Sequence, residues 1–264
     1  MVSTLDRKKT VQETGKNRYG FILAFIFMVW LFWPHNNSFI RLSYWSYDLL
    51  YNVSKLFNIP ITDEAMYNRN CAVYLAKIYP KNPEKSLKTM SKAIAVASKN
   101  KAEIELENFY KDLAIIKLYY GDKAGALESF EKVNETIEDP IDNIRAAILL
   151  SEGKRYEDAI SYCKNILVTG KDKSSLGYVC MAYVYEKTGE PEAALNVYDW
   201  IIARSSREAY LYVERANLEK RMGDIEAYQK DINTVKKINP DVDIESIAVI
   251  DNALNFKKFP LSIK

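Results

Sequence analysis

Histidine and cysteine are scarce in this chain of 264 residues, which holds one histidine, His35, and three cysteines. Zinc sites need several such residues close together, and a lone histidine directly after an uncharged run, as His35 is, is more often an interfacial residue than a catalyst. The cysteines are widely spaced, with no C-x-x-C pair, and neither a glycine-rich phosphate loop nor a nucleophile-elbow motif occurs. The sequence therefore predicts a chain that is not an enzyme and that binds no metal or cofactor.

A strong excess of either charge is also missing, since 37 basic residues face 35 acidic ones. The small excess lies at the start: residues 1–18 contain five basic and two acidic side chains, which leaves 32 basic and 33 acidic residues elsewhere. A protein that binds nucleic acid needs a basic surface to neutralise phosphates. The near-neutral remainder predicts no nucleic-acid partner.

Small residues recur through the second half of the chain with a period of about 34 residues. Spacings of 33, 35 and 34 residues separate Ala114, Ala147, Ala182 and Ala216. A second set follows each alanine twelve residues later, at Ala126, Ala159, Ala194 and Tyr228. Two helices per unit at this period are typical of a helical solenoid, in which each unit buries its apolar face only against its neighbours.

These residues resemble the tetratricopeptide repeat (TPR). The most complete unit has Tyr178, Met181, Ala182, Tyr185, Gly189, Ala194, Tyr198 and Ile201 at the expected positions. The pattern departs at Lys117 and Glu219, where the family has a tyrosine-like residue, and at Tyr228, where it has a small one. The resemblance implies an all-α, right-handed solenoid with four TPR-like repeats over residues 102–241.

Helical patterns flank these repeats on both sides. Residues 63–101 contain two amphipathic stretches separated by Pro80 and Pro83, and we interpret them as a degenerate first repeat. Residues 242–264 carry Ile244, Ile247 and Leu254 at helical spacing. Because a terminal repeat must shield its apolar surface, this region predicts a C-terminal capping helix followed by a short tail.

An uncharged run near the N-terminus, from Tyr19 to Trp33, predicts a transmembrane helix over residues 19–34. A cleaved signal peptide and a buried soluble helix are the alternatives, but no small-x-small cleavage site follows. The basic residues in 1–18 place this tail in the cytoplasm by the positive-inside rule. The sequence thus predicts a single-pass protein of a bacterial inner membrane with periplasmic repeats.

Residues 35–62 join this anchor to the repeats, and their segment Phe39–Ile59 is rich in aromatic and aliphatic residues. On a helix, Arg41, Asp48, Asn52 and Lys55 form one narrow polar stripe. Two interpretations stay open. The helix lies on the outer membrane surface or on a membrane partner, or it folds back onto the first repeat.

The TPR resemblance implies a concave groove lined by the first helix of each unit. The residues expected there are Lys111, Ile115, Ile144, Ile148, Val179, Tyr183, Tyr210, Val213 and Asn217. Most are apolar, which suits a helix or an apolar peptide from a protein partner. The alternative is that the chain's own terminal helix or a neighbouring subunit fills the groove.

Cys163 and Cys180 lie on consecutive predicted helices. Either they are small buried apolar residues, or they form a disulfide in an oxidising compartment. Together these features predict a membrane-anchored scaffold that binds proteins and supports a membrane complex. The alternatives are a chaperone-like assembly factor for exported clients and a regulatory subunit of an enzyme complex.

Overall fold

The computed structural model describes residues 38–56, 63–133, 137, 139–169, 174–255 and 260–261. The predicted cytoplasmic tail and membrane anchor, residues 1–34, lie outside them. None of the helices in the described ranges combines the length and the apolar character that crossing a membrane requires.

The described residues form thirteen helices and no strand, as expected for an all-α chain. The helices are α2 (Ser38–Leu56), α3 (Glu64–Ile78), α4 (Glu84–Lys99), α5 (Glu103–Tyr119), α6 (Lys123–Phe130), α7 (Pro140–Glu152), α8 (Tyr156–Thr169), α9 (Ser174–Thr188), α10 (Pro191–Ile202), α11 (Ala209–Met222), α12 (Ile225–Ile238), α13 (Ile244–Ile247) and α14 (Val249–Ala253).

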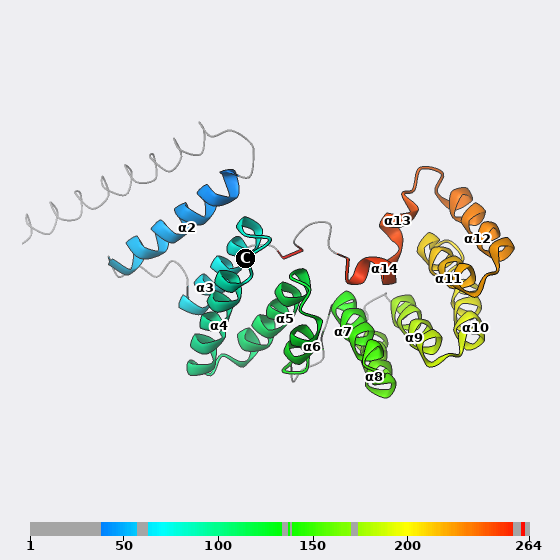
Figure 1. Cartoon of the computed structure of the whole chain (residues 1–264), viewed down its shortest axis with the longest axis horizontal. Helices are drawn as coiled ribbons and strands as arrows, with labels where there is room; N and C mark the ends of the chain where they lie inside the picture. The colour runs from blue at the N-terminus through cyan, green and yellow to red at the C-terminus, as the bar shows by residue number, and fades with distance from the viewer. Residues whose placement is uncertain are drawn as a thin grey trace, which may run out of the picture.

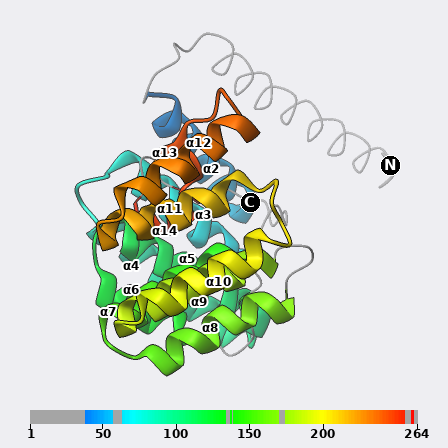
Figure 2. The same ribbon diagram turned by 90° about the vertical axis from the view of Figure 1, so that its right-hand side faces the viewer.

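Five consecutive pairs of these described helices, α3–α4 to α11–α12, form a curved row (Figure 1). Seen along the row, successive pairs lie behind one another (Figure 2). The recurrent small residues are fully buried: Ala114, Ala126, Ala147, Ala159, Ala182, Ala194 and Ala216. A side chain this small lets two helix backbones approach, while Phe130, Tyr198 and similar residues fill the space between units.

The turns inside the pairs explain where the helices stop. Gly121, Gly189 and Gly223 adopt positive φ angles of 83°, 87° and 88°, the left-handed conformation that ends a helix. The second repeat differs from the glycine pattern in the sequence. Gly153 has a φ of −81°, and the next residue, Lys154, takes the left-handed conformation with a φ of 60°.

Helix α2 packs against α3, so residues 35–62 contain a helix that folds onto the first repeat (Figure 1). Tyrosines form the contact: the rings of Tyr51 and Tyr67 stack at 3.6 Å, and Asn70 donates a 3.0 Å hydrogen bond to the Tyr47 hydroxyl. Asp48 of the predicted polar stripe also faces α3 and accepts a hydrogen bond from the Tyr67 hydroxyl. Trp45 stays 51% exposed.

A buried ion pair joins the first helix pair to the second. Nε of Arg69 in α3 lies 2.6 Å from Oδ2 of Asp112 in α5. The Arg69 side chain is only 1% exposed, so its charge is neutralised within the protein. Arg69 also donates a 2.9 Å hydrogen bond to Asn70, which extends the polar contact toward α2.

The predicted single capping helix is instead two short helices, α13 and α14. They are separated by Ala248, whose backbone is extended with φ −69° and ψ 106°. The break occurs because the backbone N–H groups of Val249 and Ile250 donate to the carboxylate of Glu214 in α11. These groups would otherwise continue a helix, and here the acid of a neighbouring helix satisfies them.

Candidate functional site

Seven of the nine predicted groove residues fall into two groups in the structure. Ile115, Ile144, Val179 and Val213 are at most 2% exposed. Their side chains therefore hold neighbouring helices together and offer little surface to a partner. Partial exposure is found for Lys111, Tyr210 and Asn217.

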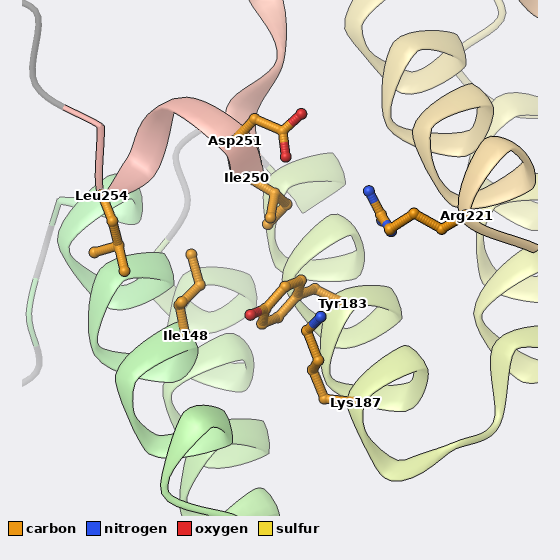
Figure 3. A pocket seen from close by; sticks show the side chains of 7 residues that line it. All are labelled: Ile148, Tyr183, Lys187, Arg221, Ile250, Asp251 and Leu254. Carbon is orange, nitrogen blue, oxygen red and sulfur yellow. The ribbon is translucent and has the colours of Figure 1, made fainter.

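Ile148 and Tyr183, the other two predicted groove residues, are covered by the chain itself. The C-terminal segment, defined here as residues 248–254, lies across the inner side of the curved row (Figure 1). Its helix α14 contacts α7 and α11, and the side chains of Ile250 and Leu254 lie over Ile148 and Tyr183 (Figure 3). An occupant from the same chain is one of the alternatives that the sequence left open.

Three polar side chains hold the C-terminal segment, and two of them act on its backbone. Glu214 accepts from the N–H groups of Val249 and Ile250, the latter at 3.1 Å. At the other end of α14, Nε of Arg145 donates a 2.8 Å hydrogen bond to the carbonyl of Ala253. Asn217 donates to the Asp251 carboxylate at 3.1 Å. The inner face thus recognises both ends of a one-turn helix.

A cavity of about 260 Å³ remains beside the C-terminal segment. It is lined by Ile148, Tyr183, Lys187, Arg221, Ile250, Asp251 and Leu254 (Figure 3). Its apolar floor has a charged rim, where Arg221 makes two hydrogen bonds of 2.7 and 2.8 Å to Glu186. The Lys187 ammonium lies 5.0 Å from the centre of the Tyr183 ring. An apolar site with a few oriented polar groups is typical of peptide and ligand binding.

Burial raises the pKa of Glu214 to about 7, although its two backbone N–H donors act in the opposite direction. Burial likewise raises the pKa of Asp142 to about 6 and that of Glu219 to about 7. Each of these carboxyl groups loses more hydration in the fold than its partners replace. Glu214 holds the C-terminal segment directly, and Asp142 lies 2.6 Å from Arg145, which holds the other end of α14.

We expect the protein to melt at a lower temperature at pH 8 than at pH 5. Because these three carboxyl groups have raised pKa values, the folded state retains protons that the unfolded state releases, and stability falls as pH rises toward about 7. Melting followed by circular dichroism at both pH values checks this. Glu214→Gln should flatten the profile, since the amide oxygen still accepts hydrogen bonds but does not titrate. A wild-type midpoint that rises between pH 5 and 8 would contradict the account.

Cys163 and Cys180 form a disulfide that joins α8 to α9, with their Cα atoms 5.4 Å apart. This is one of the two alternatives that the sequence left open. Both residues are buried in the central core, close to the repeat alanines Ala159 and Ala182. The covalent link therefore ties the second TPR-like repeat to the third.

Sequence reasoning placed Asn217 in the groove but missed Arg145 and Glu214, the two residues that bind the backbone of the C-terminal segment, although a signal for them exists. In the four repeats, the position two residues before the repeated alanine holds, in chain order, Asp112, Arg145, Cys180 and Glu214. In the structure, the first pairs with Arg69, the third forms the disulfide, and the other two bind the C-terminal segment. Charged residues at a core-facing helical position indicate a fixed partner elsewhere in the fold.

Comparison with known proteins identifies the architecture. No protein-family model and no curated protein sequence matches this chain. Among solved structures, a putative kinesin light chain of Podosopora anserina with nearly identical TPR-like repeats matches with a TM-score of 0.53. The two share 15% identity over 67% of this chain and 96% of that one.

The fold is that of a TPR solenoid. A second solved structure, the MamA RS-1 ArsTM double mutant, matches with a TM-score of 0.50 and 16% identity over 69% of this chain and 98% of that chain. At sequence identities of 15% and 16%, these two matches show a shared TPR fold and nothing about function. The site on the inner face is therefore argued from this chain's own residues.

Proposed function

We propose that this chain is a non-catalytic scaffold that binds protein partners on the inner face of its TPR solenoid. The observation that carries the proposal is the C-terminal segment itself: the inner face already holds a short helical peptide through backbone and side-chain contacts. A face that fits one such helix has the shape and the polar groups to fit another.

We further propose that residues 19–34 anchor the scaffold in a membrane. The uncharged run ends at Trp33, and α2 begins at Ser38, so four residues separate the two. A linker this short spans at most roughly 18 Å. Since α2 packs on α3, a membrane-spanning run would hold the whole solenoid close to the bilayer surface.

The location of the repeats outside the cytoplasm has two supports. The basic residues before the run favour a cytoplasmic N-terminus. The Cys163–Cys180 disulfide suits an oxidising compartment, because cytoplasmic reductants keep most thiols reduced. Together they favour a bacterial periplasm for residues 38–264.

We expect the protein to stay in the membrane fraction after carbonate extraction, and a protease added to spheroplasts to digest the repeats. The variant Ile26→Lys/Val29→Lys should be released, because two charges inside the run make insertion costly. Ile26→Leu/Val29→Leu is the matched control and should remain bound. Release of the wild-type protein would refute the anchor, and full protection of the repeats from protease would refute their orientation.

Stable co-purification of a protein after mild detergent extraction tests the scaffold itself. A scaffold retains its partner through purification. A protein that suppresses aggregation of unfolded clients without forming a stable complex would instead be a chaperone-like factor, and that result would overturn the proposal.

A further inference from the structure

The C-terminal segment is held mainly through contacts that another helix could reproduce. Glu214 and Arg145 bind backbone groups, which every peptide carries. Few apolar side chains of the segment are buried or line the cavity: Ile250 and Leu254, four residues apart, line it, and the small residues Ala248 and Ala253 are buried in the same core. The sequence requirement is therefore two aliphatic residues one turn apart, with a small residue shortly before each.

The same segment has little structure of its own. Its helix α14 has five residues, and the preceding helix α13 has four, so both are far below the length at which a helix is stable by itself. Asp251 and Asn255 are exposed, and the cavity of about 260 Å³ shows that the segment does not fill the face that it covers. Short helices with exposed edges and incomplete packing open more readily than the core of a fold.

We propose that the C-terminal segment is an internal competitor for the inner face, and that a partner binds by displacing it. The partner's binding element is a short helix whose first N–H groups reach Glu214, whose last carbonyl reaches Arg145, and which carries aliphatic residues four positions apart. An acidic residue after the first aliphatic one would pair with Asn217, as Asp251 does. The inference rests on the proposed function and adds the chemistry of the partner and its regulation.

Hydrogen exchange of the full-length protein in detergent tests the displacement. The Val249 and Ile250 amides are bonded to Glu214 and exchange only when the segment leaves the inner face. We expect them to exchange at least about 100-fold faster than the amides of Ala182 and Val184, which lie in the core helix α9. Equal protection would mean that the segment opens only with the whole fold, and would overturn the proposal.

Peptide binding tests the recognition. The probe is a fluorescent peptide of residues 240–264, added to the full-length protein and to its Ile250→Asp/Leu254→Asp variant. The charges should expel the variant's own segment, so the wild-type peptide should bind the variant at least about tenfold more tightly than it binds the wild-type protein. Asn255→Asp is the matched control, because this exposed position adds charge without facing the cavity, and it should bind as wild type does.

The outcomes separate the two proposals. Unfolding of the Ile250→Asp/Leu254→Asp variant, judged by its helical content, would make the segment part of the core and would overturn the displacement. A folded variant with fast exchange that fails to bind the peptide would count against the inner face as a binding site, and so against the proposed function. A dimer formed by exchange of segments between two copies, seen as a doubled mass, would overturn the intramolecular assignment.

Discussion

Replacing Asp112 with alanine is expected to cost about 3–5 kcal/mol of the free energy of unfolding. The variant leaves the guanidinium of Arg69 in the core without its carboxylate, and Arg69 is only 1% exposed. Removing one partner of a buried ion pair costs much more than the pair itself contributes. Urea denaturation of residues 38–264, followed by circular dichroism, measures the loss.

Two control variants show whether the charge is responsible. Arg69→Met/Asp112→Leu should recover most of the loss, because it removes both charges and keeps the volume apolar. Lys123→Ala breaks the exposed pair between Lys123 and Glu152 and should change stability by less than about 1 kcal/mol. An Asp112→Ala protein as stable as wild type would show that α3 and α5 do not meet at this ion pair.

Removing the disulfide in the variant Cys163→Ala/Cys180→Ala should cost about 3 kcal/mol. The two residues are 17 apart in sequence, and linking them restricts the unfolded chain. A reductant should lower the stability of the wild-type protein by a similar amount and leave the variant unchanged. This gives the experiment an internal control.

Counting the free thiols of protein purified from its native membrane tests whether the disulfide forms there, and therefore whether the repeats lie in an oxidising compartment. In denaturant without reductant, an alkylating reagent should label one of the three cysteines, Cys71, which is free and buried. Labelling of all three would show that the repeats reside in a reducing compartment, and it would count against the proposed location.

The repeat architecture could be predicted because packing determines it locally. Only a small side chain fits where two helix backbones come close, so the spacing of Ala114, Ala147 and Ala182 carries the information that places the helices. The turn glycines carry less information about where the helices end, because another residue can adopt the same left-handed conformation. Lys154 does so in the second repeat, one position after Gly153.

The inner face could not be predicted at the same level. An apolar residue on the first helix of a repeat can face either the groove or a neighbouring helix. The sequence around Ile144 and Ile148 does not show which of these two environments each side chain has. The structure buries Ile144 completely and covers Ile148 with Ile250 and Leu254. That contact joins residues about a hundred positions apart, and no local pattern encodes it.

Crosslinking in native membranes tests the central claim that partners bind on the inner face. A photoreactive amino acid replaces Lys187, an exposed residue at the rim of the cavity, or Lys164, an exposed residue of α8 that does not line it. We predict that illumination gives a defined protein adduct from position 187 and none from position 164. The same adducts from both positions, or an adduct from position 164 alone, would contradict the account.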